Sequence, residues 1–538
     1  MNLPVRSLVV TAACLLGAAA HAQEDPPARV GRVAEIAGDV RTINPEGAWS
    51  ALVRNQPLST GDRVTTDKNG RATLQFGSTV VRVGADSDIV VTQLDDQKIR
   101  LRFDHGQLAV RVRSDDIPGE LFIETDEGAW VPHHPGEYRF DRAAHQVLAA
   151  QAWTGDMLLE APDSSLPVAA PQRAEVWRTG AKQATHYRLV PAVKDAFGDA
   201  VLAADQADDR LAAANAAAQV PLEMTGAADL ARFGAWSVAP DGAHLWTPAK
   251  LPKDWQPYQQ GAWSWNSPWG WTWVDDQPWG FAPFHYGRWL SVKGHWAWMP
   301  GQWGATRPVY APALVGWLGG PGLALGDAPA VGWVALAPDE PVFPAYAVSA
   351  KYWNALSGAS VAPAARRTVA INGRARLAPT GAVAYANRGV PGAVAVVGAA
   401  ALLPRVPVST MPGLRGADLR KPAFDARLAK AVPTAPPAAP VGHTALSAAT
   451  PQVQVPIATA QAAGPATGVK GLAPPSAPAA PVVPAKAGGH LAGIDFARPV
   501  PPAAVAAPVV ARPTPPTAAM APIRPITAPT PPAPIASR

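Results

Sequence analysis

The chain contains 538 residues, of which 60 are proline and 20 are tryptophan, and its 46 Lys and Arg residues outnumber its 41 Asp and Glu residues. Twelve of the basic residues and three of the acidic residues lie beyond residue 400, so the net charge of +5 divides into +9 there and −4 in the first 400 residues. Because the excess positive charge lies beyond residue 400, the net charge of the whole chain is no argument for nucleic-acid binding. A chain of this length has room for about two or three domains.

The first 22 residues have the three parts of a secretory signal peptide. Arg6 precedes an apolar run at 8–20, and Ala20-His21-Ala22 forms a small-residue cleavage site. We therefore expect cleavage near Ala22 and a periplasmic or secreted mature protein. The apolar runs at 8–20 and 392–403 are shorter than the roughly 20 residues of a membrane-spanning helix, so no transmembrane span is predicted in the mature chain.

Residues 28–160 show the two-residue alternation of β-strands. Apolar side chains alternate with polar ones at 71–76, 99–104 and 108–113, which places the apolar set of each run on one face. The turn-forming pairs between such runs are Asn69-Gly70, Gly77-Ser78 and His105-Gly106. Short strands at steps of roughly ten residues predict a mainly β fold, either a sandwich or a β-roll.

Three segments of this region resemble the periplasmic domain of FecR-type proteins: Val30-Gly-Arg-Val33, Leu58-Ser-Thr-Gly61-Asp62-Arg-Val64 and 71–78. The resemblance covers about residues 30 to 160 and implies a FecR-like β domain at 28–160. The namesake of that family passes an iron-dicitrate signal from an outer-membrane receptor to a sigma factor, which requires a cytoplasmic segment and a transmembrane helix ahead of the domain. Here a predicted cleavable signal peptide precedes Val30, so the resemblance supports the domain type and not the iron-signalling role.

Six arginines lie on the polar faces of the predicted strands: Arg71, Arg82, Arg100, Arg102, Arg111 and Arg113. They could bind an acidic glycan or phosphate, or they could form a solvated outer face balanced by nearby Asp residues. We favour the second interpretation, since mixed charge is usual on the exposed face of a half-buried sheet. The adjacent His133-His134 cannot place both rings on one metal ion from a regular element, so no metal site and no cofactor are predicted.

Residues 161–219 are predicted to form a linker and one Ala-rich helix. The stretch 194–218 contains no proline, and Phe197, Val201, Leu202 and Leu211 fit a helical stripe. Such a helix is expected to pack on a neighbouring sheet.

The Trp-rich module, residues 220–355, is organised by tryptophans two residues apart. The pairs Trp263/Trp265, Trp271/Trp273 and Trp296/Trp298 each fall on one strand face, and Pro-Trp-Gly occurs at 268–270 and again at 278–280. This pattern predicts short strands and tight turns that carry indole rings. The segment Pro278-Trp-Gly-Phe-Ala-Pro-Phe-His-Tyr-Gly-Arg-Trp289 is similar to an uncharacterised Trp-rich domain that often follows FecR-type domains in exported bacterial proteins. That resemblance implies an architecture and no activity.

An indole ring serves equally well in a core or as a platform for a sugar ring. We expect most of these tryptophans to fill the core, and expect Trp269 and Trp279, in the Pro-Trp-Gly turns, to be the most exposed. The candidate binding residues are Trp269, Trp271, Trp273, Trp279, His285, Tyr286, Arg288 and Trp296.

The chain is predicted not to be an enzyme. It contains no motif of a serine hydrolase, phosphate-binding loop or zinc protease. The alternative is a carbohydrate-active enzyme that uses Asp275, Asp276 or Glu340 beside Trp platforms. Such chemistry requires two carboxylates at a defined separation, which a sequence does not reveal.

Residues 356–400 form a transition segment, and 401–538 are predicted to be a disordered basic tail rich in Pro and Ala. We hypothesise an exported, non-enzymatic protein of the cell envelope that binds or scaffolds through its FecR-like domain and Trp-rich module. The expected partners are peptidoglycan, another envelope polysaccharide or an envelope protein, and the tail could contact anionic surfaces. A periplasmic component of cell-surface signalling is a further alternative.

Overall fold

The structure is a computed structural model that describes residues 25–43, 49–143, 147–304, 306–318, 324–325, 328–358, 360, 374–375, 384–398, 407–410 and 413–415. Strands outweigh helices, 44% to 14%, so the predicted mainly β fold is confirmed. The predicted signal peptide at 1–22 lies outside the described residues, as does nearly all of the predicted tail. No helix within the described residues is long and apolar enough to cross a membrane.

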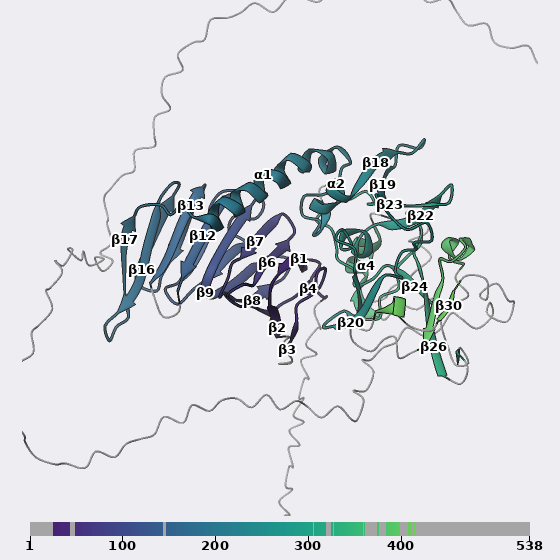
Figure 1. Ribbon diagram of the computed structural model, residues 1–538, viewed down its shortest axis with the longest axis horizontal. Coiled ribbons are helices and arrows are strands. Elements are labelled where there is room, and N and C mark those ends of the chain that lie inside the picture. The colour runs from purple at the N-terminus through teal and green to yellow at the C-terminus, as the bar shows by residue number, and fades with distance from the viewer. Residues whose placement is uncertain are drawn as a thin grey trace, which may run out of the picture. The chain divides into compact units, whose positions relative to one another are not determined.

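The N-terminal β region, residues 31–190, contains seventeen described strands (Figure 1). They are β1 (Gly31–Ala37), β2 (Val40–Ile43), β3 (Trp49–Ala51), β4 (Pro57–Leu58), β5 (Arg63–Thr66), β6 (Arg71–Phe76), β7 (Thr79–Val83), β8 (Asp88–Leu94), β9 (Ile99–Val112), β10 (Leu121–Glu124), β11 (Ala129–Pro132), β12 (Gly136–Arg142), β13 (Leu148–Thr154), β14 (Asp156–Glu160), β15 (Ser165–Ala169), β16 (Arg173–Thr179) and β17 (Ala184–Val190).

These strands form two open layers that share β9. One layer has the order β4-β1-β6-β7-β9-β12-β13-β16-β17, and the other has the order β3-β2-β5-β8-β9-β10-β11-β14-β15. All of these pairings are antiparallel except β9 with β10, which is parallel. The apolar faces of both layers contribute to one buried cluster that is mostly aliphatic, as the two-residue alternation predicts.

The sequence predicted a turn at His105-Gly106 between two strands, and this prediction is wrong. Both residues lie inside β9, which pairs with β8 and β10 through its first half and with β7 and β12 through its second half. Gly106 has a φ of +103°, and a Cβ there would come within 2.1 Å of the Ser87 hydroxyl. Glycine therefore permits a bend at which one continuous strand passes from one layer to the other.

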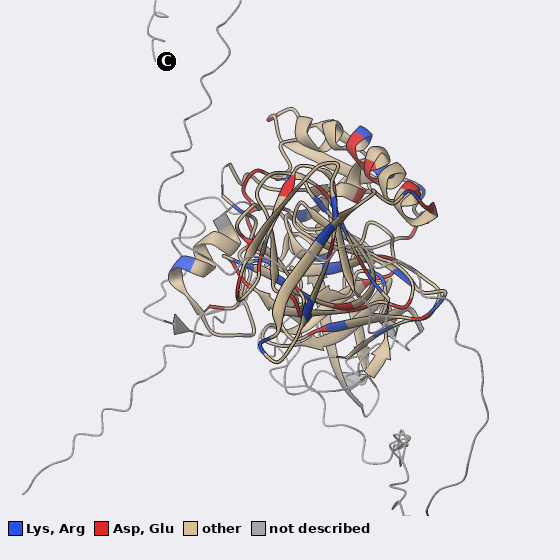
Figure 2. Cartoon of the chain, turned by 90° about the vertical axis from the view of Figure 1, so that its left-hand side faces the viewer, with Lys and Arg blue, Asp and Glu red and all other residues tan. Residues whose placement is uncertain are grey.

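The predicted Ala-rich helix is present as α1 (Ala196–Ala217), and it lies along the outer face of the β7–β9–β12 layer. Asp195 caps its N-terminus by accepting a hydrogen bond from the Gly198 amide at 2.9 Å. In Figure 2 the acidic residues of α1 appear as red bands on the long helix at the upper right. Asp205 accepts from Arg82 at 2.5 Å, and Asp209 accepts from Arg113 at 3.2 Å. This part of the outer face, predicted to be solvated, is instead covered by a helix of opposite charge.

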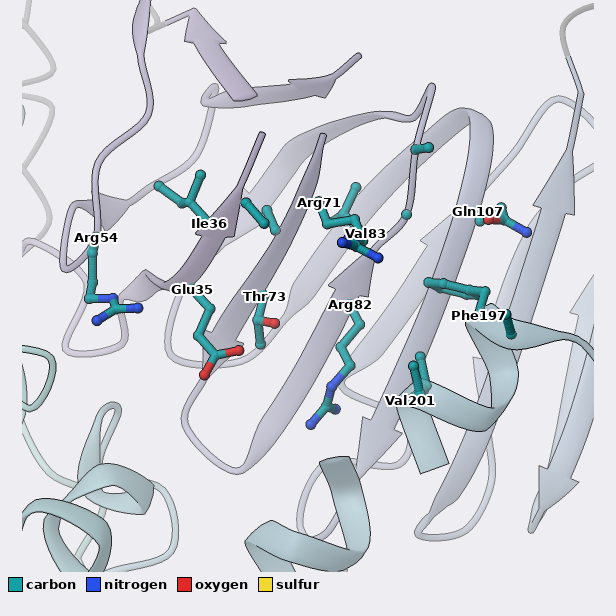
Figure 3. Close-up of a pocket in the computed structure, with 16 residues that line it drawn as sticks. Glu35, Ile36, Arg54, Arg71, Thr73, Arg82, Val83, Gln107, Phe197 and Val201 are labelled. Carbon is teal, nitrogen blue, oxygen red and sulfur yellow. The ribbon is translucent and has the colours of Figure 1, made fainter. Parts of the chain in front are cut away.

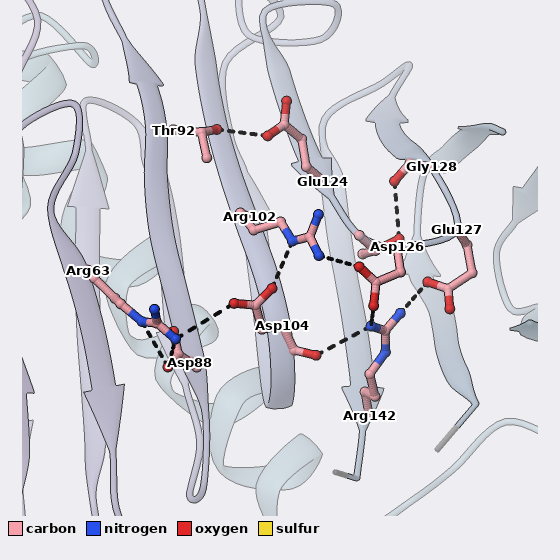
Figure 4. A network of polar contacts seen from close by, with 11 residues as sticks. Arg63, Asp88, Thr92, Arg102, Asp104, Glu124, Asp126, Glu127, Gly128 and Arg142 are labelled. Atoms are coloured by element: carbon pink, nitrogen blue, oxygen red, sulfur yellow. Dashed lines mark hydrogen bonds and ion pairs between the residues drawn. The ribbon is translucent and has the colours of Figure 1, made fainter. Parts of the chain in front are cut away.

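The outer face of the other layer does carry the exposed mixed charge that the sequence predicted (Figure 4). Arg63 pairs with Asp88 at 2.7 Å, and Arg102 pairs with Asp104 at 2.8 Å. Arg142 continues the network by donating to Asp126 and Glu127. The pairs of Arg63 with Asp88 and of Arg100 with Glu124 join neighbouring strands and so stabilise the sheet.

The Trp-rich module and the segments after it form short elements in four separate sheets. Trp263 and Trp265 lie on one strand of a hairpin, and Trp271 and Trp273 lie on the other, as the sequence predicted. The elements are η1 (Ala227–Asp229), α2 (Leu230–Phe233), β18 (Gly234–Val238), β19 (His244–Pro248), β20 (Gly261–Asn266), β21 (Gly270–Asp275), α3 (Ala282–His285), β22 (Arg288–Val292), β23 (His295–Met299), β24 (Val315–Leu318), β25 (Ala324–Leu325), β26 (Ala328–Ala335), β27 (Val348–Ser349), α4 (Ala350–Gly358), β28 (Arg374–Ala375), η2 (Ala386–Gly389), β29 (Ala395–Gly398), η4 (Val408–Thr410) and β30 (Gly413–Arg415).

The ordered sheet continues past residue 400, where the sequence placed the start of the tail. β29 pairs with β26 on one side and with β30 on the other. The apolar run at 392–403 thus supplies an inner strand, which explains its small and β-branched side chains. The remainder of the predicted tail lies outside the described residues.

Candidate functional site

All eight candidate binding residues of the Trp-rich module are buried. The most exposed of them, Trp296, has 6% of its surface accessible. The five tryptophans and Tyr286 belong to one cluster with most of the other aromatic side chains of the module. The structure places the candidates together, but it places them in the core and not on a surface.

The expected exposure of Trp269 and Trp279 is wrong, since each is 2% exposed. Trp279 lies edge-on to Trp246 with ring centroids 5.1 Å apart, and Trp269 lies edge-on to Tyr310 at 5.0 Å. In both Pro-Trp-Gly turns the chain reverses while the indole points inward. Short strands leave space between them, and the largest side chain in the turn fills it.

The indole N–H groups hold main-chain carbonyl groups that lie outside the strand ladders. Trp298 donates to Tyr286, Trp289 to Pro283 and Trp333 to Tyr258, each at 2.9 Å. Trp246, Trp303 and Trp353 donate in the same way to the carbonyls of Leu230, Pro300 and Val342. Each bond fixes the orientation of a ring and gives a main-chain carbonyl a donor from a side chain.

The polar candidates are also held by the main chain. The Nδ1–H of His285 donates to the Ala311 carbonyl at 2.8 Å, and burial lowers the pKa of this histidine to about 3, so it is neutral at physiological pH. Arg288 donates to the carbonyls of Glu340 and Gly287, and burial lowers its pKa to about 10. Both side chains stabilise turns of the module.

The carboxylates considered for catalysis have structural partners as well. Asp275 is buried and accepts from the Trp273 indole and from the Gln277 amide, each at 2.9 Å, and burial raises its pKa well above the usual range. Glu340 accepts from the amides of Ala337 and Ala386 at 2.8 and 2.6 Å. Two main-chain amides on one carboxylate are typical of a group that fixes a loop.

The start of the described chain is bound to the Trp-rich module. Asp25 accepts from the amide and hydroxyl of Ser349, and the Ala28 carbonyl accepts from the Tyr310 amide at 2.9 Å. Val30, which is fully buried, belongs to the aromatic cluster and not to the aliphatic one. The residues that lead into β1 therefore pack with a segment about 200 or more positions away.

Asn55 makes a second connection between the N-terminal β region and the module. Its side-chain amide donates to the carbonyls of Asp275 and Gln277 at 2.9 and 2.7 Å, and the residue is fully buried. The adjacent Arg32 is 1% exposed and pairs with Asp229 at 2.5 Å. These buried polar contacts have defined geometry, so they fix one orientation of the two parts at this contact.

A groove lies on the N-terminal β region (Figure 3). It lies between α1 and the outer faces of β1, β6 and β7, and its volume is about 600 Å³. Its charged side chains are Glu35, Arg54, Arg71 and Arg82. Its apolar side chains include Ile36, Val83, Phe197 and Val201. A volume of this size is within the range of ligand pockets.

The two arginines at the rim of this groove differ from the others of the region. Of the sixteen arginines in residues 25–190, thirteen form ion pairs, and Arg178 donates to two carbonyls. Arg54 and Arg71 are exposed and have no such partner among the described residues. The sequence identified Arg71 as one of a polar row, but Arg54 and Phe197 carried no signal, because the loop and helix that hold them meet only in the fold.

Comparison with known proteins finds a family model that is similar to part of the chain. Residues 227–340 match a family of unknown function, DUF6600. This span begins at η1 and ends at Glu340, so it contains most of the aromatic cluster. A search of curated proteins finds no match.

Two crystal structures of a protein assigned as an anti-sigma factor from Parabacteroides distasonis ATCC 8503, at 2.50 and 1.65 Å resolution, are similar to part of the chain. Each has 13% sequence identity and a TM-score of 0.21, and the match covers 24% of this chain and 60% of that chain. This chain therefore spans about 60% of the length of those chains. A likeness this weak supports no statement about function.

Proposed function

We propose that the chain is an exported, non-enzymatic protein of the cell envelope. In this proposal a FecR-like domain, formed by the N-terminal β region, and the Trp-rich module act as one binding or scaffolding body. The signal-peptide pattern at 1–22 supports export, and the motifs at 30–78 support the FecR-like assignment.

The observation that carries the proposal is the buried contact of Asn55 with the carbonyls of Asp275 and Gln277. A buried side-chain amide with two acceptors joins two parts of the chain that are more than 200 residues apart. The Gln277 carbonyl also accepts from the Gly280 amide, whereas loss of the Asn55 donor to the buried Asp275 costs about 1–3 kcal/mol. One body with a fixed geometry suits a scaffold better than two parts that move independently.

Two of the three carboxylates considered for catalysis support a structural role. Asp275 and Glu340 hold main-chain or indole groups within the module, as the candidate binding residue His285 does, whereas Asp276 is exposed. None of them lines the groove on the N-terminal β region. We therefore assign Asp275, Glu340 and His285 to the stability of the module and propose no reaction.

Binding to envelope polymers can be measured by sedimentation of the purified mature chain with insoluble peptidoglycan. We expect the protein to sediment with the polymer and to release no soluble fragments from it. A full-length variant with the twelve Lys and Arg residues beyond residue 400 replaced by Gln tests how much of the binding the tail contributes. Release of fragments that is lost in Asp276→Ala or Glu340→Ala would support the enzyme instead, and absence of binding to every envelope polymer would refute the proposal.

The single-body part of the proposal is tested with Asn55→Asp, which places a carboxylate against two carbonyl oxygens. Unfolding of this variant is monitored by tryptophan fluorescence, which reports mainly on the Trp-rich module, and by the far-ultraviolet signal of the strands. We expect the two probes to give transitions at different midpoints. Asn69→Asp makes the same chemical change in an exposed turn and should leave the two transitions coincident. Coincident transitions in Asn55→Asp would show that this contact does not couple the two parts.

A further inference from the structure

We propose that the groove between α1 and the outer faces of β1, β6 and β7 binds an acidic saccharide, carboxylated or phosphorylated. The inference rests on the proposed function, because it names the ligand class of an envelope-binding protein and the place where it binds. It differs from the expectation that the indole rings bind the ligand, since those rings are buried.

The charge of the groove points to an anion. Arg54 and Arg71 line it and have no acidic partner among the described residues, although most arginines of the same region are paired. The acidic residue of the lining, Glu35, lies 3.5 Å from Arg232 and forms no ion pair with Arg54 or Arg71 among the described residues. A guanidinium group presents a planar set of donors that matches a carboxylate or phosphate in two-point contact.

The apolar side of the groove points to a ring. The large apolar side chains of the lining include Phe197 on α1 and Ile36 on β1, and Figure 3 shows Phe197 at the start of α1 facing the sheet. The Arg139 guanidinium lies 5.3 Å from the centroid of the Phe197 ring, and Arg139 is itself held by Asp195. The ring is therefore fixed before any ligand binds, which is what stacking against the carbon–hydrogen face of a sugar requires.

The same features argue against other occupants. The segment beyond residue 400 carries a charge of +9 and would be repelled by the two rim arginines. A nucleic acid is held by many phosphate contacts, typically about 6–10, and two free arginines are too few. An acidic peptide has the charge but lacks the flat apolar ring, so it serves as an outcome of the test.

The test measures, by calorimetry, the equilibrium binding of the full-length mature protein to short soluble ligands. The ligands are a galacturonate hexamer, a phosphorylated mannan fragment, an uncharged galactose hexamer and a glutamate hexapeptide. We expect one or both of the acidic saccharides to bind, with an affinity at least about tenfold above that for the uncharged hexamer or the peptide. Preference between the carboxylated and the phosphorylated ligand identifies which anion the rim arginines recognise.

The variants locate the site. Arg54→Gln combined with Arg71→Gln is expected to weaken binding by about tenfold or more, and Phe197→Leu, which keeps an apolar side chain but removes the ring, by a few-fold. Arg41→Gln is the matched control, because Arg41 lies on the same region, is exposed and pairs with Asp39. Unchanged melting temperatures show that the variants fold.

Three results would overturn the inference. If the Arg54/Arg71 variant binds the acidic saccharides as tightly as the unaltered protein does, the binding site lies elsewhere. If the glutamate peptide binds as tightly as the acidic saccharides, the groove is a peptide site. If neither acidic saccharide binds, the proposed ligand class is wrong. If the protein still sediments with peptidoglycan in that last case, the groove inference fails while the proposed envelope function stands.

Discussion

The N-terminal β region and the Trp-rich module fill their cores and pair their backbone groups in different ways. The β region has long ladders whose backbone groups pair with one another, and its core is mostly aliphatic. The module has short strands and many turns, and its core is mostly aromatic. The indole N–H groups donate to carbonyls in those turns, such as those of Pro283 and Tyr258.

This difference shows how a protein built from short strands and turns can still pair its buried backbone groups. In a ladder each added residue satisfies its own backbone groups, whereas in a turn some carbonyls have no neighbour of their own. Trp supplies both a large apolar surface and one donor, so it fills the space between short elements and pairs with such a carbonyl. Trp289, Trp298 and Trp303 combine both contributions, whereas Trp263, Trp269 and Trp271 contribute their buried rings.

The largest expected effect tests the aromatic core directly. Trp273→Ala removes a fully buried ring that lies 5.3 Å from Trp263, and we expect a loss of about 3–5 kcal/mol in the free energy of unfolding. Denaturant unfolding, monitored by far-ultraviolet circular dichroism, measures this loss of stability. Trp49→Ala, at a ring that is 57% exposed, should change stability by less than about 0.5 kcal/mol. Similar losses in both variants would contradict the assignment of a packed indole core.

The next effect tests the charged contact that covers the β region. Asp205→Ala leaves Arg82 and Arg113 without a buried carboxylate, and the expected loss is about 3 kcal/mol. Thermal unfolding of the variant measures it. Asp199→Ala changes an exposed acid on the first turn of the same helix and should cost less than about 1 kcal/mol. If both variants behave alike, α1 is not held by its acidic row.

A smaller effect separates the two contributions of an indole ring. Trp298→Phe removes the donor to the Tyr286 carbonyl, while Trp263→Phe removes an indole N–H that has no partner among the described residues. Both rings are fully buried, so the lost apolar volume is nearly the same. We expect Trp298→Phe to be the more destabilising by about 1–3 kcal/mol. Equal losses of stability would show that the rings act by packing alone.

The smallest effect concerns pH. Burial raises the pKa of Asp275 in the folded state above its unfolded value of about 3.9, so the folded protein binds a proton that the unfolded chain releases. The contribution of this group is therefore fully present below about pH 4 and is lost as the pH rises through the folded pKa, by at most about 1.4 kcal/mol per pH unit. Asp275→Asn should show a shallower fall in the free energy of unfolding over that range. The comparison is made by urea unfolding at a series of pH values, and parallel curves would exclude this group as the cause.

The β fold could be predicted because its signal is local. Alternation at 71–76 and 108–113 reports the buried face of each strand, and the pairs Asn69-Gly70 and Gly77-Ser78 mark real turns. The passage through Gly106 was missed because a glycine that bends a strand and a glycine that ends one look alike in sequence. Only the pairing of both halves of β9 with different neighbours distinguishes the two cases.

The candidate site was less predictable, because it depends on contacts between distant segments. The pairing of Arg82 with Asp205 spans 123 positions, and it decides that this arginine is not available to a ligand. Arg71, from the same polar row, lines the groove as Arg54 does and has no acidic partner among the described residues. The period of a strand tells which face a residue occupies, but it does not tell which other element covers that face.

The shared strand β9 has a consequence for the order in which the molecule can assemble. Neither layer is complete until residues 99–112 have been synthesised, and β10, which lies parallel to the first half of β9, requires the connection through 113–120 as well. A nascent chain that stops before this point would carry two unfinished sheet edges with nothing to join them. Truncated products ending before β9 should therefore aggregate, while the strands added afterwards can dock one by one onto a template that already exists.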